Sequence, residues 1–410
     1  MQTTPQCHLP ATILQVLPRM ESGGVERGTM EIAEAITLSG MKAHVISAGG
    51  SLVPALARYR VVHHTMPLHS KNPLTIWRNA KRLRDYILEH RIALVHARSR
   101  APAWAAYFAC QWTNTPFITT FHGVYDLEGR FKQRYNNVMT RGAKVIAVSE
   151  FVREHVIAAY GVAAEKVIRI DRGVDFKLFA PERIVPDRMA ILTKEWRLPD
   201  DNISIILVPG RITRIKGHHT VLEALSKLQQ PNFICVFLGN AEGHEHYAKE
   251  LQEAITALNL EGKIRIVPHT RYMAEAYALS DIVLMPSLKP ESFGRVAVEA
   301  QAMGKLVIAS NHGGACETIL PNETGYLVEP GNADMLAEAI HYALSRDEYT
   351  KAAMADFAMK HVRAHYSIAR MKNATIRLYR EILGYSIKEE ILPSSASEEP
   401  SFLEPEKAYG

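Results

Sequence analysis

Short apolar runs rich in β-branched residues alternate with amphipathic stretches along the first half of the chain. The runs lie at residues 12–17, 42–47, 93–96, 116–121 and 144–149. Each is short enough for a strand, and each is apolar on both faces, which is typical of strands buried in a parallel sheet. The alternation of strands and helices therefore predicts an open α/β sheet.

A second series of the same kind follows. Its strand candidates lie at residues 203–208, 233–238, 263–267, 281–285 and 306–310, each followed by a plausible helix. The segment 176–202 contains Pro181, Pro186 and Pro199 with mixed charge and no sustained strand pattern, so we predict the inter-domain connection there. Two doubly wound sheets in succession present the carboxyl ends of their strands to one cleft, where ligands of such folds bind.

Length and composition agree with this division. At 410 residues the chain exceeds what one hydrophobic core usually supports, so two domains are expected. No apolar run approaches the roughly 18 residues of a membrane span, and no signal sequence precedes the first strand, which predicts a cytoplasmic protein. The four cysteines lack CxxC spacing, so we expect reduced thiols.

The net charge of +5 is unevenly distributed. Residues 386–410 hold six Glu and two Lys, a balance of −4, which leaves +9 on residues 1–385. The composition of this acidic segment predicts a disordered tail. The basic excess could serve nucleic acid, anionic lipid or phosphorylated substrates. Since no basic stripe is interleaved with aromatic residues, we expect no nucleic-acid partner.

A cationic loop follows the first strand of the second series. In residues 209–217 two glycines frame Arg211, Arg214 and Lys216. Arginine offers a planar fork to phosphate oxygens and lysine a compact charge, so the loop suits a diphosphate. A solvated basic loop is the alternative for such a motif taken alone.

Two glutamates lie on either side of a glycine in residues 290–300. Glu291 precedes Gly294 in a loop, and Glu299 lies about two turns into the helix that this glycine opens. The amides of Phe293, Gly294 and Arg295 can face an anion at the helix start. Taken singly, the glutamates would be a loop residue and part of a solvated helix face.

Residues 290–300, together with Gly313, Gly314 and Glu317, resemble the donor site of family 4 glycosyltransferases. The resemblance implies the GT-B fold and a retaining transfer from a nucleotide sugar. It implies an N-terminal acceptor-side domain at 1–185, a donor domain at 186–370, a helix crossing back at 371–385 and the tail at 386–410.

The resemblance also assigns roles. Arg211 and Lys216 contact the two phosphates, Glu299 the ribose hydroxyls and Glu291 the transferred sugar. His122, at the end of the strand 116–121, lies against that sugar, although a lone histidine is usually structural. Gly23 and Gly24 form a loop that borders the donor phosphate and the acceptor. We thus predict a catalytic set of His122, Arg211, Lys216 and Glu291, and a donor-binding set of Gly23, Gly24, Phe293, Gly294, Arg295 and Glu299.

We expect neither a metal nor a cofactor. There is no Asp-x-Asp pair, and His218–His219 and His244/His246 lack a convincing third ligand. The dinucleotide fingerprint GxGxxG is also absent, which argues against a dehydrogenase. In this interpretation the cationic side chains of Arg211 and Lys216 stabilise the negative charge of the diphosphate in place of a metal ion.

The acceptor side is less defined. Arg98, Arg100, Arg130 and Lys132 are candidates for an anionic acceptor, with a solvated loop as the alternative for the first two. The basic helices 73–91 and 127–141 are either ordinary amphipathic helices or surfaces that dock on anionic membrane. A lipopolysaccharide or related envelope glycan is the preferred acceptor. A sugar-nucleotide epimerase and a non-catalytic sugar-nucleotide-binding protein are the competing functions.

Overall fold

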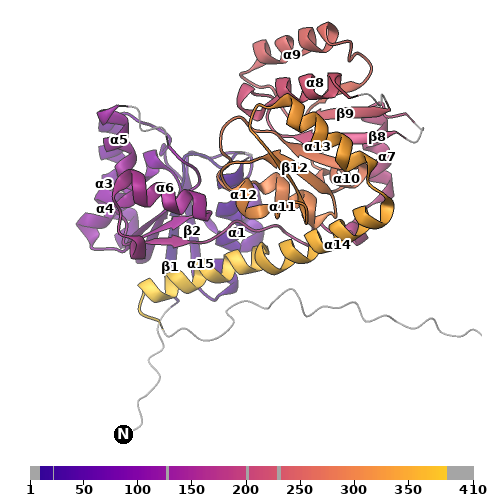
Figure 1. The fold of residues 1–410 in the computed structure, drawn as a ribbon. Coiled ribbons are helices and arrows are strands. Elements are labelled where there is room, and N and C mark those ends of the chain that lie inside the picture. Colours follow the sequence, from indigo (N-terminus) through magenta and orange to yellow (C-terminus); the bar gives the residue numbers. More distant parts are fainter. Residues whose placement is uncertain (1–9, 22, 126–128, 200–202, 229–231, 386–410) are drawn as a thin grey trace, which may run out of the picture.

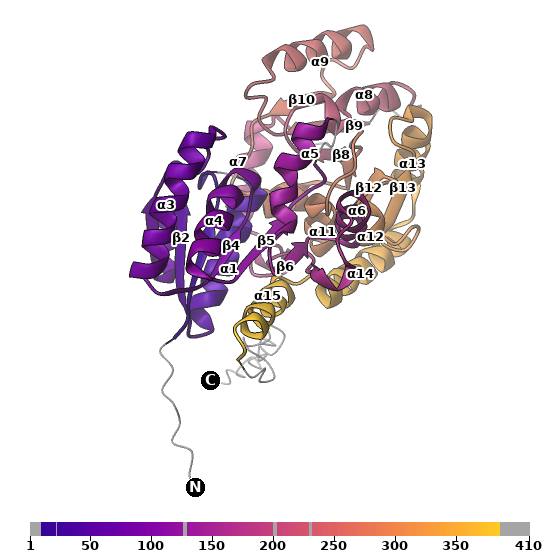
Figure 2. The ribbon, with the colours of Figure 1, turned by 90° about the vertical axis from the view of Figure 1, so that its left-hand side faces the viewer.

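The computed structural model describes residues 10–21, 23–125, 129–199, 203–228 and 232–385 (Figure 1). The predicted acidic tail at 386–410 lies outside the described residues. The chain forms two parallel sheets that lie side by side, as the paired sequence patterns predict. Figure 2 shows helices α3 and α4 side by side on one face of the first sheet.

The first sheet has the order β3-β2-β1-β4-β5-β6-β7, with every pair parallel. Its strands are β1 (Thr12–Val16), β2 (Lys42–Ser47), β3 (Val62–Thr65), β4 (Ile92–Ala97), β5 (Phe117–Phe121), β6 (Lys144–Ala147) and β7 (Val167–Arg169). Its helices are α1 (Gly24–Leu38), α2 (Val53–Leu56), α3 (Pro73–Glu89), α4 (Arg100–Thr113), α5 (Arg130–Asn136) and α6 (Glu150–Tyr160).

The second sheet has the order β10-β9-β8-β11-β12-β13, again with every pair parallel. Its strands are β8 (Ser204–Pro209), β9 (Phe233–Leu238), β10 (Ile264–Val267), β11 (Ile282–Met285), β12 (Leu306–Ser310) and β13 (Gly325–Val328). The helices that follow Val174 are α7 (Pro186–Glu195), α8 (His218–Ser226), α9 (Glu245–Ala257), α10 (Met273–Leu279), α11 (Arg295–Ala302), α12 (Ala315–Thr318), α13 (Ala333–Ser345), α14 (Glu348–His365) and α15 (Ile368–Ile382).

Helices cover both faces of each sheet, which explains the uninterrupted apolar strands. Successive side chains of β1 point to opposite faces of the sheet. Leu14 belongs to the core that the sheet forms with α3 and α4, and Ile13 belongs to the core that it forms with α1 and α15. Edge strands lack this double burial. β3 reads Val-His-His-Thr and is largely exposed, β7 has three residues, and β13 begins with a glycine, so the sequence pattern did not reveal them.

The segment 176–202 contains more structure than the sequence suggests. Helix α7 begins with Pro186 in its first turn, and Leu192 and Trp196 are buried in the core of the second sheet. Phe179 is buried in the same core. The predicted boundary between the two domains, at residues 185 and 186, stays a prediction.

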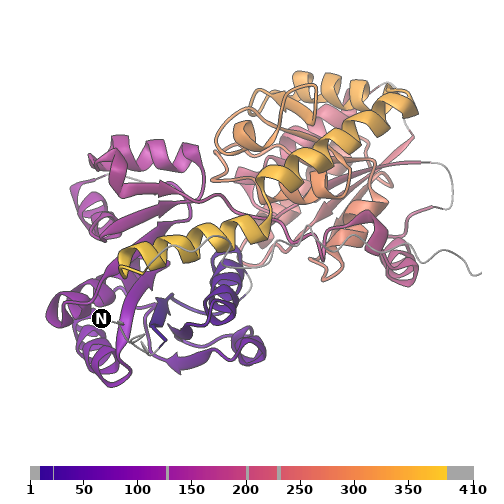
Figure 3. The ribbon, with the colours of Figure 1, turned by 90° about the horizontal axis from the view of Figure 1, so that it is seen from below.

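The chain crosses between the sheets at two places that are hydrogen-bonded to each other. The amide of Val174 donates to the carbonyl of Tyr366 at 2.8 Å, and the amide of Ile368 donates to the carbonyl of Val174 at 3.0 Å. From there α15 packs against α1 in the first domain (Figure 3). Within the described residues, no helix combines the length and the apolar character that crossing a bilayer requires.

Candidate functional site

The loop after β8 carries Lys216 to a carboxylate of the loop after β11. Lys216 Nζ forms a short ion pair with Glu291 Oε1, and Ser287 Oγ donates to the same oxygen at 2.6 Å. Gly217 makes the approach possible, because its φ is +74° and a Cβ there would lie 1.9 Å from the carbonyl oxygen of Pro286. Burial acts to raise the pKa of Glu291, but Lys216 and the hydrogen bonds outweigh it and hold that pKa below its usual value.

Arg211 has different surroundings from Lys216. It is exposed and lines a cavity of about 460 Å³ together with residues 243–247 at the start of α9. The neighbouring Arg214 pairs with Glu250 at 2.5 Å. The cationic loop thus directs Lys216 toward Glu291 and leaves Arg211 facing solvent.

The start of α11 is built on glycines. Gly294 precedes the helix with φ +86°, a conformation that favours glycine, and the first amides of the helix have no intrahelical acceptor. Gly314 donates its amide to the carbonyl of Glu291 at 2.7 Å, and a Cβ at Gly314 would lie 2.5 Å from the Cα of Phe293. Phe293 itself is buried against Tyr366. The backbone from Glu291 to Arg295 is therefore fixed from both sides.

Glu299 lies on α11 where the two domains meet. Its carboxylate accepts from the hydroxyl of Tyr277 at 3.1 Å and lies 3.6 Å from Arg295 Nε. Arg27 of the first domain approaches the same carboxylate to 3.8 Å. Burial, and then the charge of Glu299, hold the pKa of Tyr277 well above its ordinary value, so this hydroxyl stays a donor. A second contact across the domains joins Arg295 to Glu31 at 3.7 Å.

On the first domain, His122 follows β5 and meets an arginine that the sequence did not reveal. Arg172 Nη2 donates to His122 Nδ1 at 2.8 Å and to the carbonyl of Gly24 at 3.1 Å. Because Nδ1 accepts, the neutral ring carries its proton on Nε2, and this atom is buried without a partner among the described residues. Burial, followed by the charges of Arg172 and Arg98, holds the pKa of His122 well below its usual value.

Gly23 precedes α1 and Gly24 is its first residue, and both are exposed. The carbonyl of Gly24 is tied to Arg172, which joins the glycine loop to the surroundings of His122.

The four acceptor candidates do not form one cluster. Arg98 follows β4 and is 3% exposed. Arg100 instead donates to Asn136 at 2.8 Å and stacks 4.2 Å from the ring of Tyr125. Lys132 is exposed on α5, and the side chain of Arg130 lies outside the described part of the chain.

Glu317 contributes to the contact between the domains rather than to the donor loop. Its carboxylate accepts from the amides of Glu150 and Phe151 at 2.9 and 2.7 Å, and thus caps α6 of the first domain. Arg169 lies 3.1 Å from the same carboxylate. Ser149 Oγ also crosses the interface and donates to the carbonyl of Ser292 at 2.5 Å.

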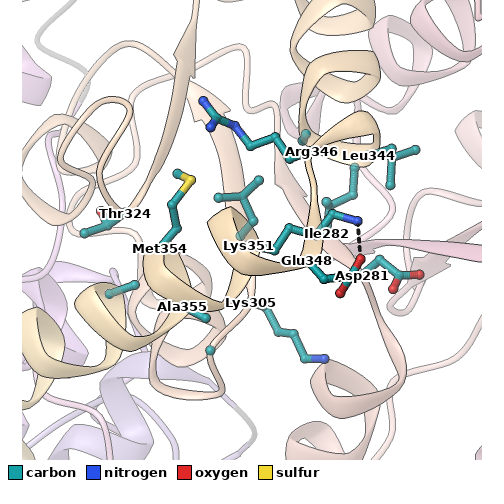
Figure 4. A pocket seen from close by; sticks show the side chains of 14 residues that line it. Asp281, Ile282, Lys305, Thr324, Leu344, Arg346, Glu348, Lys351, Met354 and Ala355 are labelled. Atoms are coloured by element: carbon teal, nitrogen blue, oxygen red, sulfur yellow. Dashed lines mark hydrogen bonds and ion pairs between the residues drawn. The ribbon is translucent and has the colours of Figure 1, made fainter.

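A further cavity of about 90 Å³ lies between the second sheet and α14 (Figure 4). It is lined by Asp281, Lys305 and Arg346 among others, at the amino ends of β11 and β12. Ligands of open α/β sheets bind at the carboxyl ends of the strands, where Lys216 and Glu291 lie. This cavity is therefore separate from the candidate site. Among the described residues no group of three or more His, Cys, Asp or Glu side chains could hold a metal ion.

Two parallel-sheet domains of Rossmann type that face one another, with a final helix returning to the first, define the GT-B class of fold. Known families match both halves of the chain. Residues 22–178 match the model described as Glycosyltransferase Family 4, and residues 193–360 match the one described as Glycosyl transferases group 1.

Similar proteins agree with this match. A glycosyltransferase from Rickettsia africae of known crystal structure is 41% identical with a TM-score of 0.86, covering 92% of this chain and 100% of that one. Anabaena HepE in complex with UDP-glucose has a TM-score of 0.79 at 24% identity, covering 90% of this chain and 99% of that one. The D-inositol 3-phosphate glycosyltransferase 1 of Catenulispora acidiphila is 28% identical over 60% of this chain and 59% of its own length. The chain belongs to glycosyltransferase family 4.

Proposed function

We propose that the protein is a retaining glycosyltransferase that moves a sugar from a nucleotide-sugar donor to a glycan or glycolipid acceptor. The observation that carries the proposal is the pair of Lys216 and Glu291 beside the free amides of the α11 start. The pair combines a cation for phosphate, a carboxylate for sugar hydroxyls and a helix terminus for negative charge. The UDP-glucose complex of HepE supports a nucleotide sugar as the donor.

We propose for these residues the roles that the family resemblance implies. Lys216 and Arg211 contact the diphosphate, the second from its solvent-facing position. Glu299 accepts hydrogen bonds from the ribose hydroxyls, and Glu291 from the transferred sugar. Gly23, Gly24 and the amides of residues 293–295 border the phosphates. His122 presents Nε2–H to the sugar, which the buried and unpartnered state of this atom supports.

In the proposed reaction the bond from the anomeric carbon to the diphosphate oxygen breaks while the acceptor oxygen bonds to the same face of that carbon. The departing phosphate oxygen takes the acceptor proton, and cations of the chain stabilise the charge that develops on the diphosphate. Closure of the domains around the paired crossing at Val174 and Ser367 would exclude water that hydrolyses the donor.

A panel of UDP, GDP and ADP sugars, with release of the nucleoside diphosphate as the readout, tests the proposal. Envelope glycolipids serve as acceptors, and the anomeric configuration of the product is read by NMR. Conversion of the donor alone into an isomer would favour the epimerase alternative. Binding without turnover would favour a sugar-nucleotide-binding protein.

We also propose a cytoplasmic location with peripheral contact to anionic membrane, and a lipopolysaccharide or related envelope acceptor. The outer face of α3 and α4 supports this proposal: Trp77 and Trp112 are 47% and 41% exposed and stack edge to face at 4.9 Å. Exposed Arg78, Lys81 and Arg82 lie on the same helix as Trp77. Exposed tryptophans beside cations suit a lipid interface. Co-sedimentation with phosphatidylglycerol vesicles, but not with phosphatidylcholine vesicles, is expected, and binding should weaken in Trp77→Ala.

A further inference from the structure

Two arginines of the first domain are buried without an anionic partner. Arg98 is 3% exposed and Arg172 is 7% exposed. Among the described residues no carboxylate forms an ion pair with either guanidinium. The nearby Glu31 pairs with Arg295 instead. A buried charge is costly unless it is paired, so this arrangement requires an explanation.

Glu31 attracts both guanidiniums and Glu26 attracts Arg172, but neither carboxylate pairs directly with them, and the hydrogen bonds of the described residues bring them no charged acceptor. Arg172 donates to His122 and to the carbonyl of Gly24, which are both neutral acceptors. Arg98 Nε is buried with no partner within the described residues. A structural arginine would be expected to saturate backbone carbonyls or to meet a carboxylate.

The positions of these residues point to the cleft. Arg98 follows β4, His122 follows β5 and Arg172 lies beyond β7, so all three lie at the carboxyl edge of the first sheet. Ligands of such sheets bind at that edge. Burial and then the charge of Arg98 lower the pKa of Arg172 to about 9, with Arg295 on α11 of the second domain contributing to the lowering and Glu31 and Glu26 opposing it. The arginine is thus close enough to the other domain to interact with it across the cleft.

The chain also makes room for one of the guanidiniums. Gly28 lies on α1, and a Cβ at this position would come within 2.0 Å of Arg172 Nη1. Any other residue at this position would force the guanidinium to move. The absence of a side chain at Gly28 therefore keeps Arg172 between the start of α1 and His122.

We propose that Arg98 and Arg172 form an anion-binding site that takes a phosphate or carboxylate group of the sugar substrate lying against the first domain. This inference rests on the proposed function and narrows its substrates to acidic ones. The anion would form the ion pair that Arg98 and Arg172 lack among the described residues, and His122 Nε2–H would offer a further donor to the anion or to the sugar beside it.

Inorganic phosphate is the probe. The full chain is first saturated with the nucleoside diphosphate that it binds, so that the donor site is occupied. Phosphate is then titrated at constant ionic strength while the thermal midpoint and the heat of binding are followed. We expect phosphate to raise the midpoint of the wild type. In Arg98→Met and in Arg172→Gln we expect phosphate affinity to fall about tenfold or more. Lys360→Gln, which alters an exposed pair with Asp356 on α14, should match the wild type.

The thermal stability of the Arg98 variant without phosphate shows whether this arginine serves anion binding or the stability of the fold. Arg98→Met keeps an apolar stem and removes an unpaired buried charge, so its midpoint without phosphate should equal or exceed that of the wild type. An undiminished phosphate response in this variant, or a lowered midpoint without phosphate, would overturn the inference. So would a tenfold loss of affinity for the nucleoside diphosphate, because the arginines would then serve the donor phosphates.

Two further measurements identify the source of the anion. If the transferred sugar carries it, the wild type should bind a hexuronate donor more tightly than the matching hexose donor, and both variants should lose this preference. If the acceptor carries it, donor affinities should be unchanged, and transfer to phosphorylated acceptors should fall in both variants. A wild type that binds no nucleoside diphosphate would refute the proposed function, whereas the phosphate titration could still be carried out without nucleotide.

Discussion

The ion pair of Lys216 and Glu291 gives the sharpest prediction about this protein. The two side chains are 22% and 25% exposed, so each keeps some contact with water. Removing one partner of a fully buried pair costs about 3–5 kcal/mol. Because of the residual exposure, we expect Lys216→Ala to lower the free energy of unfolding by about 2–3 kcal/mol. Glu291→Gln should cost less, since the amide can still accept the hydrogen bond of Ser287.

A double-mutant cycle isolates the interaction between the two residues. Urea unfolding of the single and double variants should give a coupling free energy of about 2 kcal/mol. The exposed pair of Lys227 and Asp334 provides a matched control, because its side chains are 44% and 77% exposed. A coupling below about 0.5 kcal/mol is expected there. An equally small coupling for Lys216 and Glu291 would refute the reasoning.

The pH dependence of the coupling has a defined sign. The pKa of Glu291 is lowered in the folded protein from an ordinary value of 4.5. The stability from the pair is therefore fully present above that ordinary value, and it is lost as the pH falls through the lowered value of the folded state. A coupling that increased in acid would contradict the assignment.

The same substitution tests the catalytic role. If Lys216 stabilises the departing diphosphate, Lys216→Ala should lower kcat by about 100- to 1000-fold, as removal of a single stabilising donor does elsewhere. Lys227→Ala should leave kcat unchanged. Release of the nucleoside diphosphate is the assay, and an unchanged kcat in Lys216→Ala would remove the lysine from the mechanism.

Three other predictions concern single residues. Glu299→Gln should weaken nucleoside diphosphate binding about tenfold in calorimetry, because an amide is a poorer acceptor for ribose hydroxyls; unchanged affinity would count against that contact. Glu317→Gln should destabilise the start of α6 by about 1 kcal/mol and speed proteolysis between the domains, whereas wild-type protection would show that the cap is dispensable. Burial lowers the pKa of His218 to about 4. Below the ordinary pKa of 6.5 this histidine binds a proton in the unfolded state but not in the folded state, so it alone should lower the free energy of unfolding by about 3 kcal/mol between pH 6.5 and 4. His218→Leu should reduce the pH dependence of thermal unfolding by this amount and leave the part that comes from other buried histidines such as His44 and His122, whereas the exposed His69→Asn should keep the wild-type dependence. An unchanged dependence in His218→Leu would exclude this histidine as a source.

The central strands could be predicted from the sequence because burial on both faces gives each one a continuous apolar run. Residues 42–47, 233–238 and 306–310 are strands with the predicted bounds. β3 is polar and largely exposed, β7 has three residues, and β13 has four and begins with a glycine, so none of them gives such a run, whereas the edge strand β10 does lie within the predicted 263–267. Helix α7 was missed because Pro186 and its charged residues are typical of a linker, whereas Leu192 within it and Trp196 after it are buried in the core.

The candidate site divides in the same way. Lys216, Glu291 and Gly294 belong to local motifs in which glycines and charges recur at short spacing, so the sequence indicates them. Arg172 and Glu317 are defined by partners 148 and 166 residues away, Gly24 and Phe151. Nothing local distinguishes Arg172 from an ordinary surface charge, and Glu317, which the resemblance groups with the donor site, gives no local sign of its contact with α6. These contacts can be found only once the two domains are placed together.

The two halves of the cleft differ in how their charges are balanced. In the second domain Lys216 and Arg295 already face carboxylates, so a diphosphate that binds there must exchange partners with Glu291 and Glu299. Under the proposed function this exchange is useful, because each carboxylate that loses its cation becomes available to a sugar hydroxyl as the phosphates arrive. In the first domain no carboxylate among the described residues forms an ion pair with Arg98 or Arg172 that would have to be released. An anion bound there would gain the full charge interaction, and the substrate on that side would be selected by its charge more than by its hydroxyls.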